Sequence, residues 1–85
     1  MKEFKHVIAD PLGMHARAAG MLVKAASGFA SKITIVAPNG TADAKRLMAL
    51  MRLAAKQGNE LTVTVEGDDE ETAAAELQAF LAANL

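Results

Sequence analysis

A strand gives way to a helix within Pro11-Leu12-Gly13-Met14-His15-Ala16-Arg17-Ala18-Ala19. Proline and glycine interrupt the preceding strand, and the alanine-rich residues that follow His15 favour a helix. The first N–H groups of a helix have no partner within it, and together with the aligned peptide dipoles they attract an anion. His15 lies at this helix start, and Arg17 lies inside the first turn. The stretch therefore indicates phosphate chemistry.

His15 and Arg17 supply the groups that such chemistry needs. A neutral imidazole is a nucleophile, and a helix N-terminus disfavours its protonated form. Arg17 adds a permanent, forked positive charge that matches phosphate geometry. A histidine at a helix start is otherwise an ordinary polar surface residue, and the residues alone leave both interpretations open. His6, the second histidine, lies mid-strand among apolar neighbours, so we expect it to be structural.

Hydrophobic periodicity predicts strands and helices around this stretch. Alternation at every second residue predicts strands, whereas apolar residues recurring at intervals of three and four predict helices. The expected strands are Lys2–Ala9, Ser31–Ala37, Thr41–Asp43 and Glu60–Glu66, and the expected helices are Ala16–Ser27, Ala44–Gln57 and one opened by Gly67–Glu71. This order favours a single α+β domain, residues 1–85, built as a two-layer sandwich. All the helices would cover one face of an antiparallel sheet whose other face is wet.

Four local signals carry expectations about the backbone. Gly28 suits the left-handed position that ends a helix, and Gly20 inside the same helix indicates either a close approach or a packing contact. Asn39-Gly40 predicts a hairpin turn in which both central residues have positive φ. The acidic residues of Gly67–Glu71 are expected to cap the third helix rather than to bind a metal.

Composition and charge narrow the function. The chain has no cysteine, no apolar run near the ~20 residues of a membrane span and no secretion signal, so we expect a soluble cytoplasmic protein without membrane insertion. Aromatic residues are 4% and all phenylalanine, which disfavours nucleic-acid binding by base stacking. Residues 11–56 carry a net charge of +6 and residues 57–85 one of −7. This asymmetry indicates a basic face around His15, suited to an acidic partner or a phosphate.

The expected helix Ala44–Gln57 carries more apolar surface than one core contact uses. Its apolar side chains span an arc of about 220°, whereas a surface helix needs a stripe only a little wider than about 100°. Methionine at the excess positions suits a surface that fits several partners. A wide core groove would bury the same residues, but we favour an interface.

The motif Gly13-Met14-His15-Ala16-Arg17 resembles the active-site motif of the HPr family, the histidine-containing phosphocarriers of the bacterial phosphoenolpyruvate-dependent sugar phosphotransferase system. The likeness runs from about Phe4 to the C-terminus and includes the length and the order of elements, so it implies a four-stranded open-faced sandwich. It also implies that Nδ1 of His15 accepts a phosphoryl group from Enzyme I and passes it to the IIA component of a sugar permease. The oxygens of the phosphoryl group on His15 would bind the Arg17 side chain and the N–H groups of Ala16, Arg17 and Ala18.

The resemblance further implies a partner surface beside His15. We expect the phosphoryl transfer to need no metal or cofactor held by this chain. Its expected residues are Met14, Arg17, Ala19, Gly20, Lys24, Lys45, Arg46, Leu47, Met48 and Met51. Two positions depart from the family pattern. Ala18 replaces the usual proline, which restores one N–H and relaxes φ. Arg46 stands where many Gram-positive members have a regulatory serine, so control by a serine kinase is expected to be absent.

Three functions stay open at this point. The first is a monomeric phosphocarrier, not a stand-alone enzyme, with Enzyme I and IIA domains as partners. The second is an HPr-like regulatory paralogue in another phosphorelay. The third is a small α+β module in which the helix start and Arg17 hold the phosphate or carboxylate of a metabolite. A conventional enzyme is disfavoured because the spacing shows no Ser-His-Asp set, carboxylate pair or metal cluster.

Overall fold

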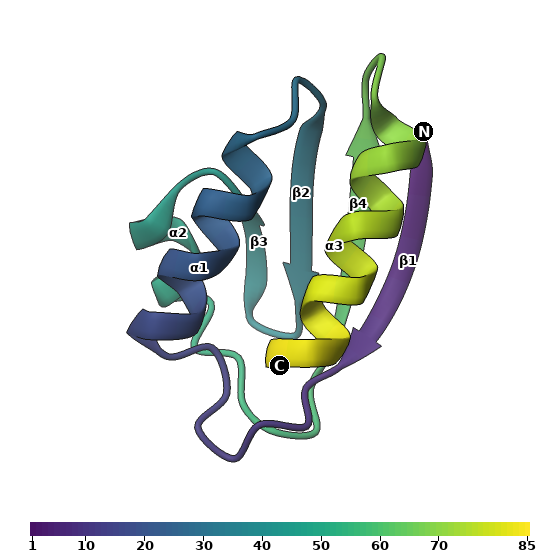
Figure 1. Cartoon of the computed structure of the whole chain (residues 1–85). Helices are drawn as coiled ribbons and strands as arrows, with labels where there is room; N and C mark the ends of the chain where they lie inside the picture. Colours follow the sequence, from purple (N-terminus) through teal and green to yellow (C-terminus); the bar gives the residue numbers. More distant parts are fainter.

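The computed structural model describes all 85 residues and arranges them in two layers (Figure 1). The elements are β1 (Lys2–Val7), α1 (Ala16–Ser27), β2 (Lys32–Ala37), β3 (Gly40–Asp43), α2 (Leu47–Arg52), β4 (Glu60–Glu66) and α3 (Glu70–Asn84). The strands form one antiparallel sheet in the order β1-β4-β2-β3. The helices lie on one face of it, which confirms the expected α+β open-faced sandwich. No helix combines the length and hydrophobicity of a membrane span.

Strand alternation places one face of the sheet in the core. In β4, Leu61, Val63 and Val65 are at most 1% exposed, whereas the threonines between them lie half-buried on the other face. The helices cover this apolar face with small and branched side chains. The buried residues of α1 and α3 are Ala18, Ala19, Leu22, Ala26, Ala73, Leu77 and Leu81. The short alanines let α1 lie close to the layer beneath it.

The β2–β3 hairpin is confirmed, but its turn differs from the one expected. Ala37 pairs with Gly40, so the two central residues are Pro38 and Asn39. Neither has positive φ, because proline fixes φ near −65° and excludes the mirror-image turn at that position. The Asn39 side chain instead donates to the main-chain oxygen of Leu53 at 3.2 Å. The proline therefore moves the turn one residue toward the N-terminus.

Helix α2 is shorter at both ends than the expected Ala44–Gln57. At its start, the Ala44 N–H donates to the Ile33 oxygen at 3.0 Å and thereby extends the sheet. Beyond its end, Ala54 has a φ of 48°, which is incompatible with a right-handed helix. At the start of α2, this hydrogen bond to distant backbone overrides the helical propensity of Ala44.

Two glycines also differ from expectation. Gly28 has a φ of −75° rather than a left-handed conformation, because α1 ends by tightening. The N–H groups of Gly28 and Phe29 donate to the oxygens three residues before them, as in a 3₁₀ turn. No atom lies within 4 Å of the position that a Cβ of Gly20 would occupy, so the expected close contact is absent there.

Gly13 anchors the loop that leads into α1. Its φ is 65°, and a Cβ on this residue would lie 2.3 Å from the main-chain oxygen of Ala55. The next residue, Met14, donates its N–H to that same oxygen at 2.9 Å and is buried. The loop before α1 is therefore docked on the segment that follows α2, and only glycine fits at the contact.

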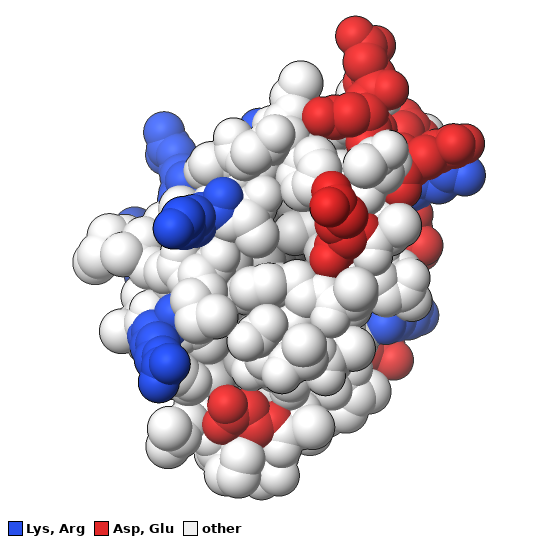
Figure 2. Space-filling view, in the orientation of Figure 1, with Lys and Arg blue, Asp and Glu red and all other residues white.

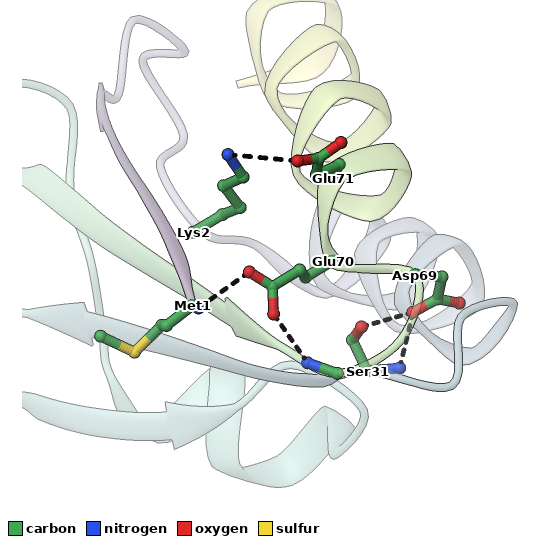
Figure 3. Close-up of polar contacts among 7 residues, drawn as sticks. Met1, Lys2, Ser31, Asp69, Glu70 and Glu71 are labelled. Atoms are coloured by element: carbon green, nitrogen blue, oxygen red, sulfur yellow. Dashed lines mark hydrogen bonds and ion pairs between the residues drawn. The ribbon is translucent and has the colours of Figure 1, made fainter.

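Asp69, at the start of α3, does not cap its own helix as expected. Its carboxylate accepts the Ala30 N–H at 2.8 Å. It also accepts the Ser31 N–H at 2.9 Å and the Ser31 hydroxyl (Figure 3). The Ser31 hydroxyl, and then the Ala30 N–H, hold the pKa of Asp69 below its ordinary value. Beside it, Glu70 pairs with the amino group of Met1 at 2.8 Å. These acidic residues tie α3 to the beginnings of β2 and β1.

Gly13→Ala should destabilise the fold by at least about 2 kcal/mol, because it adds left-handed strain and a clash with the Ala55 oxygen. Gly20→Ala is the matched control, since its methyl group meets open space within a helix and should stabilise by about 0.5–1 kcal/mol. Urea unfolding measures both changes. Equal effects of the two substitutions would contradict the docking of this loop.

Acid should weaken the fold partly through Asp69. Its folded-state pKa lies below the ordinary value of 3.8, so the stability it contributes is complete well above pH 3.8 and is lost as the pH falls through the folded-state pKa. The urea midpoint of Asp69→Asn should therefore depend less on pH below about pH 5 than that of the wild type. Asp68→Asn, at the neighbouring exposed carboxylate, should keep the wild-type dependence. A wild-type pH profile for Asp69→Asn would refute the assignment.

Candidate functional site

His15 is the N-cap residue of α1, and its backbone is extended, with φ −84° and ψ 170°. Its Nδ1 accepts the Ala18 N–H at 3.5 Å, a long and weak hydrogen bond. The N–H groups of Ala16 and Arg17 donate to no protein acceptor. The three N–H groups expected to bind phosphate thus lie together at the helix start: two are free, and the third points at Nδ1. The imidazole side chain is 29% exposed, so solvent or a partner can reach it.

Asp10 lies on the Nε2 side of the imidazole, and no sequence motif indicated that it would lie beside His15. Its Oδ2 is 3.7 Å from Nε2 of His15, while its Oδ1 accepts the Leu12 N–H at 2.8 Å. An aspartate directly before Pro-Leu-Gly is typical of a turn in which the carboxylate accepts an N–H two residues on. That signal places the turn, but it does not reveal that the free oxygen faces the histidine.

A shallow hollow of about 160 Å³ lies between the start of α1 and the end of α3. Its lining residues are Asp10, His15, Arg17, Ala18, Met21 and Asn84. Pockets for drug-sized molecules commonly enclose about 300–1,000 Å³. The hollow therefore suits a small anionic group better than a whole metabolite, which weakens the case for a metabolite-binding module.

The excess apolar surface of α2 lies partly in solvent, as expected. Leu50 and Leu53 are buried in the core, whereas Leu47 is 42% and Met48 is 64% exposed. Met51 lies between these extremes, half-buried against the core. Because α2 packs beside α1, this exposed apolar surface belongs to the layer that also carries His15 (Figure 1).

The charges separate in space as they do along the chain. Figure 2 shows basic side chains over α1 and α2, and acidic side chains gathered around the start of α3. Arg17, Lys24 and Arg46 are exposed. Lys45 is half-buried, and its amine donates to the Phe29 oxygen at 2.8 Å. The side of the molecule that carries α1 and α2 is therefore predominantly positive.

Not every residue expected at the partner surface is accessible. Met14 is 5% exposed and Ala19 is fully buried, because Met14 follows the docked Gly13 and Ala19 belongs to the core stripe of α1. Neither can present its side chain to a partner in this structure. Gly20 is half-buried. His6 is half-buried in β1, with Nε2 buried and without a hydrogen-bond partner, and its structural role stays a prediction.

Both the sequence and the structure of this chain are similar to those of known proteins. Residues 2–83 match the family model described as "PTS HPr component phosphorylation site". The phosphocarrier protein HPr of Mycoplasma genitalium is 41% identical over 85 residues, which cover 99% of this chain and 97% of that protein. The crystal structure of HPr-C-His from Thermoanaerobacter tengcongensis is similar with a TM-score of 0.92 at 38% identity, covering 99% and 94% of the two chains.

A third relative shows that this fold also occurs in dimers. The catabolite repression containing protein Crh of Bacillus subtilis, whose crystal structure is a domain-swapped dimer, is 30% identical with a TM-score of 0.77, covering 100% of this chain and 98% of Crh.

The match to the family model spans nearly the whole chain and includes the helix start at which His15 and the free N–H groups of Ala16 and Arg17 lie. This chain is a member of the HPr family, the histidine-containing phosphocarriers of the bacterial phosphotransferase system.

Proposed function

We propose that this chain carries phosphoryl groups in a sugar phosphotransferase system, from phospho-Enzyme I to the IIA components of sugar permeases. The observation that carries the proposal is the position of His15 as the N-cap of α1, next to the free N–H groups of Ala16 and Arg17. A nucleophile and an anion-binding site are thus adjacent in one partly exposed place. This arrangement suits a group that must be both received and released.

The chemistry follows from this geometry. The lone pair of Nδ1 forms a bond to phosphorus while the bond between phosphorus and its donor breaks, and the electron pair of that bond leaves with the donor. The phosphoryl oxygens then accept hydrogen bonds from the N–H groups of the first turn and from the Arg17 guanidinium. Binding through a few exposed donors holds the group loosely, as a carrier requires. In this proposal the chain is a transfer intermediate and not a stand-alone enzyme.

The partners would bind the side of the molecule that carries α1 and α2. The accessible residues proposed for this surface are Arg17, Gly20, Lys24, Lys45, Arg46, Leu47, Met48 and Met51. Apolar side chains ringed by positive charge suit acidic partners with an apolar centre, and methionine adapts to more than one of them. We propose that the chain acts as a monomer in the cytoplasm, and that Arg46 excludes control by phosphorylation at that position.

Incubation with phosphoenolpyruvate, Mg²⁺ and purified Enzyme I should add one phosphoryl group to the chain, in an acid-labile bond. His15→Ala should abolish the gain, which intact-protein mass spectrometry measures. His6→Gln is the matched control, because it removes the chain's other histidine and should leave the gain intact. A phosphoryl group that persists in His15→Ala, or that is absent from the wild type, would exclude the proposed role.

Met48→Glu should weaken binding to Enzyme I by about 1–2 kcal/mol, roughly five- to thirtyfold in Kd, because it places a negative charge in the apolar centre of the proposed surface. Val7→Glu is the control: Val7 is also an exposed apolar residue, at 54%, but it lies in β1 at the far edge of the sheet from α2. Isothermal titration calorimetry measures both affinities. Equal losses for the two variants would place the interface elsewhere.

A further inference from the structure

We propose that Asp10 is a positioning residue for His15, and that together with the Ala18 N–H it holds the imidazole in the tautomer that can attack phosphorus. The proposal rests on the proposed function, because it takes Nδ1 as the attacking atom. It concerns two groups outside the motif that identified the site. One is a carboxylate in the preceding turn, and the other is an N–H that exists only because residue 18 is not proline.

Asp10 is held in place by three hydrogen bonds. Its N–H donates to the main-chain oxygen of Leu85 at 3.0 Å, and its C=O accepts the Gly13 N–H at 3.0 Å. Its Oδ1 accepts the Leu12 N–H at 2.8 Å. These bonds occupy the backbone and one carboxylate oxygen. The remaining oxygen, Oδ2, faces Nε2 of His15 at 3.7 Å, with both side chains partly shielded from solvent.

The two neighbours of the imidazole favour the same tautomer. A neutral imidazole carries one N–H and one acceptor nitrogen. The Ala18 N–H points at Nδ1 and favours the lone pair on that nitrogen, and the proton then lies on Nε2, toward the negatively charged Asp10. A separation of 3.7 Å exceeds a direct hydrogen bond, but contacts of this kind in unliganded sites are often long and tighten in the reacting complex.

The same arrangement serves the transfer step. When the Nδ1 lone pair forms its bond to phosphorus and the donor departs with the electron pair of the broken bond, Nε2 keeps its proton and the ring becomes positive. The Asp10 carboxylate then faces that positive charge and offsets it. The Ala18 N–H loses Nδ1 as its acceptor and becomes free to donate to a phosphoryl oxygen. Transfer to the next acceptor reverses each of these changes.

Asp10→Asn tests the proposal with little change of shape. The amide oxygen of asparagine can still accept the Leu12 N–H, whereas its NH₂ group would face Nε2 and favour a lone pair there. In long-range ¹H–¹⁵N NMR spectra of the unphosphorylated protein, at a pH where the ring is neutral, the wild type should be mainly protonated on Nε2. The variant should shift toward protonation on Nδ1, and its phosphorylation by Enzyme I should slow at least tenfold. An unchanged tautomer ratio or an unchanged rate would overturn the proposal.

Asp43→Asn is the matched control. Asp43 makes the same kind of turn bond, accepting the Lys45 N–H at 2.9 Å, but it lies at the end of β3 and does not line the hollow at His15. This variant should keep the wild-type tautomer ratio and rate. If Asp10→Asn does not fold, Ala18→Pro supplies the test, because it removes the N–H at Nδ1 and should lower the share of the Nε2–H tautomer. An unchanged share in Ala18→Pro would equally refute the proposal.

These readouts separate the positioning role from the carrier role. The tautomer ratio is measured on the unphosphorylated chain and needs no partner protein, so it tests the positioning of His15 by itself. A wild-type chain that shows the Nε2–H tautomer but gains no phosphoryl group would reject the carrier function alone. A chain that is phosphorylated on His15 with no tautomer preference would reject the role of Asp10 alone.

Discussion

The docking of the Gly13–Met14 backbone on the main-chain oxygen of Ala55 determines where α1 begins. This contact joins the loop after β1 to the segment after α2, about forty residues later in the chain. Because α1 starts directly after it, the contact sets the direction in which the first N–H groups point. It also brings α2, with its exposed Leu47 and Met48, into the helical layer that carries His15. A proposed reaction site and a proposed partner surface thus depend on one backbone hydrogen bond and one glycine.

The charged groups at the helix start act on a phosphoryl group in opposite directions. In the proposed site, two free N–H groups and the Arg17 guanidinium would attract the oxygens of a phosphoryl group. The Asp10 carboxylate, on the Nε2 side of the imidazole, repels the same oxygens while it favours a positive ring. The site is also shallow and partly exposed, so each interaction is weakened by water. In the proposed function, a phosphoryl group held in this way would be bound well enough to be carried and weakly enough to be passed on.

Periodicity predicted the fold well because both layers obey it: the alternation of β4 and the three- and four-residue spacing of α1 correspond directly to buried faces. Local causes shifted the β2–β3 turn and the end of α1, whereas the larger errors arose where a side chain or N–H bonds to backbone far away in sequence. Ala44 joins the sheet through Ile33, and Asp69 binds backbone 38 and 39 residues away instead of capping α3. The motif predicted His15 and Arg17 as site residues, but the contact between Asp10 and His15 depends on how the turn folds back, which no local pattern encodes.

The measurement that tests the central claim most directly is the NMR spectrum of the phosphorylated chain, in which ¹⁵N chemical shifts and coupling to ³¹P identify the modified atom. The structure predicts phosphorylation on Nδ1 of His15, because that nitrogen faces the Ala18 N–H of the first turn while Nε2 faces Asp10. A phosphoryl group on Nε2, or on any residue other than His15, would contradict the account, since its oxygens would then lie against a carboxylate or away from the helix start.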